Sequence, residues 1–123
     1  MREFESNLEA ANKYLKRFSS NITGHYVNGE VTVPAGCRTF ENTTPNDQSP
    51  LGEIVQGSVE DVDTACMAAK HAFEEWRELA GPARRKLLHH FADLIEARAE
   101  EIALVESMDC GQPIRFMKQA AIR

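Results

Sequence analysis

Apolar residues near the start of the chain recur at steps of three and four, the spacing of one helix face. This stripe consists of Phe4, Leu8, Ala11, Leu15 and Phe18. Ser6 and Glu9 have the spacing of a capping box, so we expect an amphipathic helix of about three turns to begin there. We assign residues 1–23 to an N-terminal amphipathic helix or arm, which docks on the rest of the chain or on another chain.

The next segment favours short strands joined by tight turns. Asn28-Gly29 stands between β-forming residues, and this dipeptide readily adopts the positive φ angles of a two-residue type I′ turn. The pattern predicts a hairpin with strands near 25–27 and 30–33. Two further strand candidates are "RTFENTTP" and "GEIVQG", separated by the turn residues "PNDQSP".

From Ser58 onward the pattern becomes helical. Glu60 and Asp61 fall in the first turn, where carboxylates oppose the positive end of the helix dipole. Gly81-Pro82 ends this helix and begins the next, because Gly suits the position after a helix and Pro suits a first turn. The apolar face of the first of these helices comprises Val62, Ala65, Cys66, Ala69, Ala72, Phe73 and Trp76.

A second long apolar face predicts one continuous helix that ends at Gly111. Arg98 interrupts this face, and we expect its aliphatic stem to lie along apolar surface. Pro113 opens a third helix, which runs to Arg123 without a capping residue for its last carbonyls. The apolar face comprises Leu87, Leu88, Phe91, Leu94, Ile95, Ile102 and Val105.

These two helix faces are larger than three or four short hairpin strands can cover, since isolated hairpins are marginal in water. Together with the uncapped last helix, they predict that the chain is truncated within an element and that a larger part is missing. The alternative is a self-standing small α+β protein with a binding or interaction role, whose exposed helix faces are buried by self-association.

The composition, 42% hydrophobic and 27% charged, is that of an ordinary soluble globular protein. A net charge of −5 argues against nucleic-acid and anionic-membrane partners, because phosphate binding needs clustered Lys and Arg. The compact basic run Arg84, Arg85 and Lys86 is expected to be a solvated helix face, with an anion contact or an interface as alternatives. No apolar run approaches the ~18 residues of a membrane span.

The three cysteines, Cys37, Cys66 and Cys110, form no C-x-x-C pair, so neither a disulfide framework nor a zinc knuckle is indicated. Cys66 shares a helix face with Ala65 and Ala69 and is predicted to be a small core residue. The first residues lack the apolar stretch of a signal peptide. We therefore expect a cytoplasmic protein.

Candidate catalytic chemistry is sparse. Cys110 is the obvious nucleophile, because "CGQP" leads into a helix N-terminus that would stabilise a thiolate, but its nearest histidines, His89 and His90, lie about five turns back. Only His89 shares a helix face with Asp93, since adjacent histidines point about 100° apart, and two ligands are fewer than a zinc site needs. No glycine-rich phosphate loop is present. We predict no catalytic and no cofactor-binding residue in this chain, with a small thiol enzyme as a further hypothesis.

The order of three segments is more specific: "HYVNGE", then "TFENTTPNDQSPLGEIVQGSVEDVDTACMAAKHAFEEWREL", then "ARRKLLHHFADLIEARAEEIALVESMDCGQPI". From about Gly24 onward the chain resembles the N-terminal part of the aldehyde dehydrogenase superfamily. The family signature E-x-x-D-x-G-(K/Q)-P is matched by Glu106, Asp109, Gly111, Gln112 and Pro113. Within the family, "DCGQPI" is most similar to dehydrogenases of the 5-carboxymethyl-2-hydroxymuconate semialdehyde type, with betaine-aldehyde dehydrogenases close behind.

The resemblance implies an α/β family fragment, mostly helical with short antiparallel β-hairpin strands. Residues 24–123 would form an incomplete N-terminal portion of a dinucleotide-binding domain. Family members oxidise aldehydes to carboxylates with NAD or NADP, using a cysteine, a glutamate and an asparagine that all come later in family sequences. The chain alone is therefore expected to be inactive and to bind no cofactor. Its implied partner is the remainder of the dehydrogenase subunit, within a homo-oligomer, or else a second copy of the chain.

One family feature maps onto residues present here. The resemblance implies a monovalent cation held by backbone carbonyls and one carboxylate, involving Asn42, Thr43 and Asp109. The alternative is that Asp109 hydrogen-bonds a nearby turn while Asn42 and Thr43 cap a strand end. A hard cation prefers five or six oxygens, so one carboxylate leaves both alternatives open.

Overall fold

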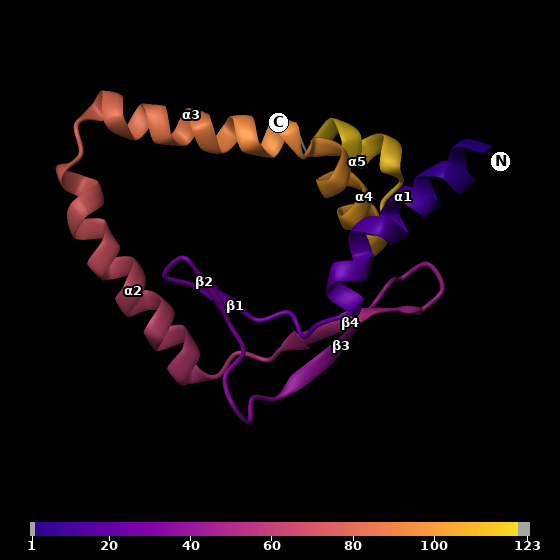
Figure 1. The fold of residues 1–123 in the computed structure, drawn as a ribbon, viewed down its shortest axis with the longest axis horizontal. Coiled ribbons are helices and arrows are strands. Elements are labelled where there is room, and N and C mark those ends of the chain that lie inside the picture. The colour runs from indigo at the N-terminus through magenta and orange to yellow at the C-terminus, as the bar shows by residue number, and fades with distance from the viewer. Residues whose placement is uncertain (1, 121–123) are drawn as a thin grey trace.

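The computed structural model describes residues 2–120. Helices and strands follow each other in an open triangular arrangement, in which α2 and α3 form two sides (Figure 1). The hairpins lie along the third side, and α1, α4 and α5 gather at the corner where α3 ends. The elements are α1 (Arg2–Ser19), β1 (His25–Val27), β2 (Glu30–Thr32), β3 (Thr39–Thr43), β4 (Pro50–Val55), α2 (Val59–Glu78), α3 (Gly81–Ala97), α4 (Ala99–Cys110) and α5 (Ile114–Ala120).

The strands form two antiparallel pairs, β1 with β2 and β3 with β4. Asn28 and Gly29 turn the first hairpin with φ angles of 54° and 83°, which confirms the predicted type of turn. The segment before β1 lies along β4, because the Thr23 N–H donates to the Glu53 carbonyl at 2.8 Å and the Thr23 carbonyl accepts from the Val55 N–H at 3.0 Å. These bonds join the two hairpins.

The core lies where α1 packs on β4 and on α4. A close approach makes this packing possible: a Cβ added to Gly52 would lie 2.5 Å from the Phe18 carbonyl oxygen. Glycine at this position therefore lets the end of α1 rest directly on β4. The buried hydrophobic residues are Ala11, Leu15, Leu51, Val55, Ala103 and Leu104.

An ionic cluster fastens α1 to α4 beside this core. Glu101 of α4 accepts two hydrogen bonds from the Arg98 guanidinium, at 3.0 Å and 2.8 Å, and lies 2.6 Å from Arg17 Nη1 of α1. The Glu101 side chain is only 14% exposed. The hydrogen bonds from Arg98, followed by the charge of Arg17, hold the pKa of Glu101 below its ordinary value, although partial burial opposes them.

The prediction of one continuous helix up to Gly111 is wrong, because α3 ends at Ala97 and α4 begins at Ala99. Arg98 between them has φ −113° and ψ 14°, outside the helical range. The break lets α4 turn away from α3 and pack Ala103 and Leu104 in the core with α1. Apolar spacing resumes at Ile102, so the only sign of the break in the sequence is Arg98, which was interpreted as a polar interruption of one continuous helix face.

The predicted start of the first helix is wrong, whereas that of α2 is correct. The α1 helix begins at Arg2 rather than Ser6, with Glu3 and Glu5 in its first turn, so the capping box expected at Ser6 and Glu9 is wrong. A capping box does form at α2, where the Ser58 hydroxyl accepts from the Asp61 N–H at 3.1 Å and Asp61 accepts from the Ser58 N–H at 2.8 Å. The last predicted helix is present as α5, and residues 121–123 of that prediction lie outside the described residues.

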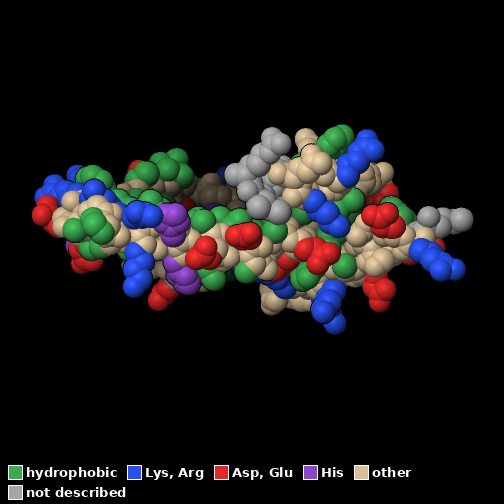
Figure 2. All heavy atoms as spheres, turned by 90° about the horizontal axis from the view of Figure 1, so that it is seen from above, with side chains coloured by type: hydrophobic (Ala, Val, Ile, Leu, Met, Phe, Trp, Pro, Cys, Tyr) green, Lys and Arg blue, Asp and Glu red, His purple; other side chains and the backbone are tan. Residues whose placement is uncertain are grey.

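Neither α2 nor α3 contains a buried residue. Their large apolar side chains are exposed, as the hydrophobic groups between charged and histidine side chains on one face illustrate (Figure 2). No helix within residues 2–120 has both the length and the apolar character needed to cross a bilayer. The exposed apolar set on the two helices comprises Val59, Val62, Met67, Phe73, Trp76, Leu87, Leu88, Phe91 and Leu94.

Replacing Glu101 tests the ionic cluster. Glu101→Gln should lower the free energy of unfolding by roughly 1 kcal/mol near neutral pH, because both arginines lose a charged partner. Since the pKa of Glu101 is lowered in the folded state, its contribution is present above the ordinary carboxyl value and is lost as the pH falls through the folded value. The deficit should therefore vanish in acid. Urea unfolding measures it, with exposed Glu100→Gln as the control; equal losses for both variants would refute the cluster's role.

Candidate functional site

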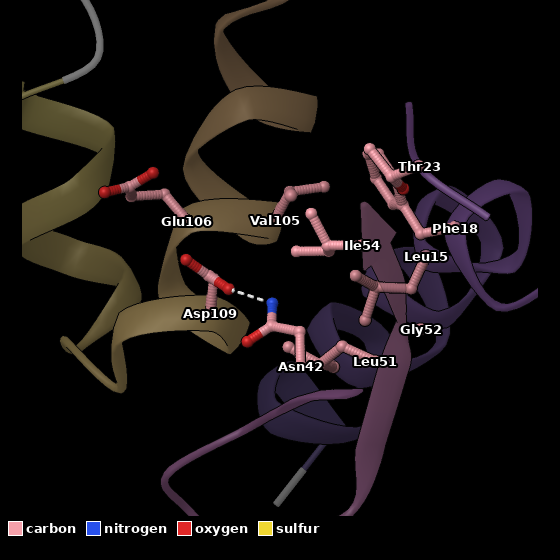
Figure 3. Close-up of a pocket in the computed structure, with 10 residues that line it drawn as sticks. All are labelled: Leu15, Phe18, Thr23, Asn42, Leu51, Gly52, Ile54, Val105, Glu106 and Asp109. Carbon is pink, nitrogen blue, oxygen red and sulfur yellow. Dashed lines mark hydrogen bonds between the residues drawn. The ribbon is translucent and has the colours of Figure 1, made fainter. Parts of the chain in front are cut away.

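A pocket of about 200 Å³ opens between the end of α1, the β3–β4 hairpin and α4 (Figure 3). One wall is apolar, and the α4 side carries the carboxylates of Glu106 and Asp109. The lining residues are Leu15, Phe18, Thr23, Asn42, Leu51, Gly52, Ile54, Val105, Glu106 and Asp109.

Asn42 and Asp109 meet at the polar end of the pocket. The Asn42 Nδ2 amide donates a hydrogen bond to Asp109 Oδ1 at 2.5 Å, joining residues 67 positions apart. Asn42 lies where the β3–β4 register shifts, and Asp109 lies in the last turn of α4. The Glu106 carboxylate points away from this contact (Figure 3). The hydrogen bond therefore ties the hairpin directly to α4.

The structure brings together two of the three residues predicted to hold a cation. Thr43 follows Asn42 in β3 but does not line the pocket. Among residues 2–120 no group of three or more His, Cys, Asp or Glu side chains is placed to hold a metal ion. Asp109 supplies the one carboxylate of the expected ligand set, and its Oδ1 accepts a hydrogen bond from the Asn42 amide.

The loop after α4 packs against the turn of the second hairpin. Gly111 ends α4 with a φ of 73°, and a Cβ there would lie 2.8 Å from Pro45 Cγ. The Ser107 hydroxyl donates to the Gln112 carbonyl at 2.6 Å and holds the loop. Sequence reasoning did not foresee this packing, although the glycine after Cys110 was a signal for it. The contact keeps Asp109 beside Asn42.

The environments of Cys110 and Cys66 differ from those predicted. Cys110 is exposed and is the last residue of α4, so it lies at the carboxyl end of a helix, where unpaired carbonyls disfavour an anion. The segment "CGQP" does lead into α5, which begins at Ile114, but Cys110 itself ends α4 and does not lie in the first turn of α5. Cys66, predicted to be a core residue, is exposed because the face of α2 that carries it is uncovered, and Cys37 is half-buried. His89 and His90 are exposed on α3.

Comparison with known proteins gives this geometry a family context. The sequence model of the aldehyde dehydrogenase family matches residues 32–123. The NADP/NAD-dependent aldehyde dehydrogenase PuuC of Escherichia coli is 47% identical over 93 residues, which cover 73% of this chain and 19% of PuuC. The chain thus belongs to the aldehyde dehydrogenase family.

Solved structures agree with this assignment. HpcC from Thermus thermophilus superposes with a TM-score of 0.88 at 29% identity, over 94% of this chain and 22% of HpcC. The NAD+ complex of aldehyde dehydrogenase from Bacillus cereus gives a TM-score of 0.79 at 33% identity, over 85% of this chain and 22% of that protein. The chain spans about a fifth of the length of these relatives. The predicted fold class, the N-terminal part of an aldehyde dehydrogenase, is confirmed.

A double-mutant cycle tests the contact at the polar end of the pocket. Asn42→Ala and Asp109→Ala should each lower the free energy of unfolding by about 1 kcal/mol, and the double variant should lose little more than either single variant. Chemical denaturation measures all four proteins. Glu106→Ala is the matched control, and its effect should add to that of Asn42→Ala. Additive effects for Asn42 and Asp109 would show that their hydrogen bond does not contribute.

Proposed function

We propose that this chain forms the N-terminal portion of the coenzyme-binding domain of an NAD(P)-dependent aldehyde dehydrogenase subunit, which oxidises an aldehyde to a carboxylate. The observation that carries the proposal is the pair of bare apolar faces on α2 and α3, in a fold that matches about a fifth of complete dehydrogenases. Residues 1–23 serve as an amphipathic arm, and residues 24–123 supply the incomplete domain.

The partner that covers α2 and α3 is the remainder of the same subunit. Apolar side chains such as Phe73 and Phe91 are 57% and 62% exposed, and contiguous exposure of this kind is typical of surfaces that bind protein. Self-association of a free-standing binding protein, the alternative drawn from the sequence, receives no support from the family matches. We place the assembled subunit in a cytoplasmic homo-oligomer.

The chemistry of such a subunit divides between this chain and the rest. NAD or NADP accepts the hydride, and the family's nucleophile, base and oxyanion donors lie later in the sequence than Arg123. The role of the present residues is to position elements of the coenzyme-binding domain. The semialdehyde class of substrate is proposed from the motif "DCGQPI", which ends α4 and packs on the β3–β4 turn.

An activity assay tests this division of labour. The purified chain, supplied with a panel of aldehydes and with NAD+ or NADP+, should produce no rise in absorbance from the reduced cofactor. Cys110 should react with iodoacetamide as slowly as a free cysteine, because it lies at the carboxyl end of α4 and not in the first turn of a helix. Turnover that Cys110→Ser abolishes would overturn the proposal and favour a thiol enzyme.

We also propose that a monovalent cation binds between β3 and α4, through the Asp109 carboxylate and the backbone carbonyls of Asn42 and Thr43. The support is the convergence of Asn42 and Asp109 at the polar end of the pocket. A cation would neutralise the Asp109 charge and strengthen the link between hairpin and helix.

Thermal unfolding in matched salts tests the cation. Sodium or potassium chloride should raise the melting temperature by a few degrees over choline chloride at equal ionic strength, because a ligand that binds only the folded state stabilises it. Asp109→Asn should abolish the difference, and Glu106→Gln, in the same pocket, should keep it. Equal melting temperatures in all three salts would contradict the proposal.

A further inference from the structure

His25, the first residue of β1, carries a buried ring nitrogen without a partner. Its Nε2 atom is shielded from solvent and makes no hydrogen bond to any described residue, while the side chain as a whole is 24% exposed. Buried polar atoms in folded proteins nearly always have a hydrogen-bond partner, so this nitrogen calls for an explanation.

The nearest acidic group to this nitrogen belongs to the first turn of α2. His25 Nε2 lies 3.6 Å from Asp61 Oδ2, a separation that is long for a hydrogen bond but short for an ion pair. The same oxygen accepts hydrogen bonds from the N–H and the hydroxyl of Ser58, both at 2.8 Å. The carboxylate is thus fixed in place by the capping box and faces the imidazole.

The Asp61 carboxylate is held in its ionised form. Hydrogen bonds from the Ser58 backbone and side chain lower the pKa of Asp61, against a smaller opposing effect of burial. The carboxylate therefore stays ionised in the range near pH 6.5 where an ordinary histidine takes up a proton. A protonated imidazole at this position would meet a full negative charge, whereas a neutral ring with its hydrogen on Nδ1 leaves Nε2 bare.

No other charged group described near this contact is placed to pair with the His25 ring in the way that Asp61 is. The residue opposite His25 in β2 is Thr32, which is uncharged, and Glu30 pairs with Val27 at the far end of the hairpin. Arg38, in the segment before β3, lines a hollow together with Asp61, but no ion pair joins them in the described structure.

The position of the pair gives it mechanical importance. The α2 helix contacts β1 and buries none of its own residues, so few contacts hold its first turn against the hairpin. The His25 ring also packs on the link between β4 and α2, since a Cβ added to Gly57 would lie 3.5 Å from His25 Cε1. His25 and Asp61 therefore lie at the joint between the hairpin and α2.

We propose that His25 and Asp61 form a proton-dependent latch at this joint. Proton uptake by the imidazole allows its Nε2–H to donate to the Asp61 carboxylate and fastens the β1–β2 hairpin to the first turn of α2. Proton release removes the positive charge, so at most a weaker hydrogen bond from a neutral Nε2–H remains and the joint loosens. The latch depends only on residues of this chain and not on the proposed dehydrogenase activity.

Hydrogen exchange of the 123-residue chain, followed by mass spectrometry at about pH 5.5 and about pH 8, tests the latch, with rates corrected for intrinsic exchange. Amides in 25–32 and 59–66 should be about two- to fivefold better protected at the lower pH, the range expected for a partly exposed ion pair. The core helix α4 serves as an internal reference, and the protection of its amides should be nearly the same at the two pH values.

Two test variants, a substitute for one of them and a control decide the outcome. His25→Phe keeps a ring without nitrogens, and Asp61→Asn removes the negative charge. In either variant, the ratio of protection between the two pH values for amides in 25–32 and 59–66 should fall to the ratio seen for α4. If His25→Phe disturbs folding, the smaller His25→Asn, which also lacks a titrating group, replaces it. His71→Gln, an exposed histidine on α2, should retain the wild-type ratio. A ratio that survives in both His25 variants, or is absent from the wild-type protein, would overturn the proposal.

Discussion

The packing of α1 between β4 and α4 is the constraint on which the rest of the structure depends. Leu15 and Ala11 of α1 are buried together with Leu51 and Val55 of β4 and with Ala103 and Leu104 of α4. This contact joins segments that are far apart in the sequence, and the salt bridge between Arg17 and Glu101 reinforces it. Without it, the hairpins and α4 would lose their common support.

The pocket and its polar end follow from this packing. Because α1 rests on β4 at Gly52, the end of α1 supplies one wall of the pocket, and α4 is held at the distance from β3 that lets Asp109 meet Asn42. The close packing of Gly111 on Pro45 also holds the loop after α4 against the β3–β4 turn. The core therefore determines the site, whether its final role is to bind a cation or to fasten the hairpin to α4.

Features set by neighbouring residues were predictable from the sequence, and features set by contacts between distant segments were not. The turn at Asn28-Gly29 and the helix start at Ser58 depend on a few neighbouring residues, and both were found as expected. The break at Arg98 and the packing of Gly111 on Pro45 arise from tertiary contacts, which leave no periodic trace. The convergence of Asn42 and Asp109 was anticipated through family resemblance rather than through spacing, because 67 residues separate them.

The uncovered faces of α2 and α3 connect the fold to the proposed function. A core confined to α1, β4 and α4 is small for a chain of 123 residues, and the two longest apolar faces contribute nothing to it. In our account these faces are complete only when the rest of a dehydrogenase subunit covers them. In this account the chain is one part of a larger domain. The contacts among α1, β4 and α4 stabilise it, and the apolar faces of α2 and α3 bind the rest of the domain.

The most direct test of this account is the fluorescence of a hydrophobic dye such as anilinonaphthalene sulfonate, measured with the purified chain while native mass spectrometry records its assembly mass. We predict strong dye binding by the folded chain. Polar replacements at Phe91 and Leu94 on α3 should reduce binding without a loss of stability, because both side chains are exposed. Absence of dye binding, in a chain that has buried these faces by self-association, would contradict the account.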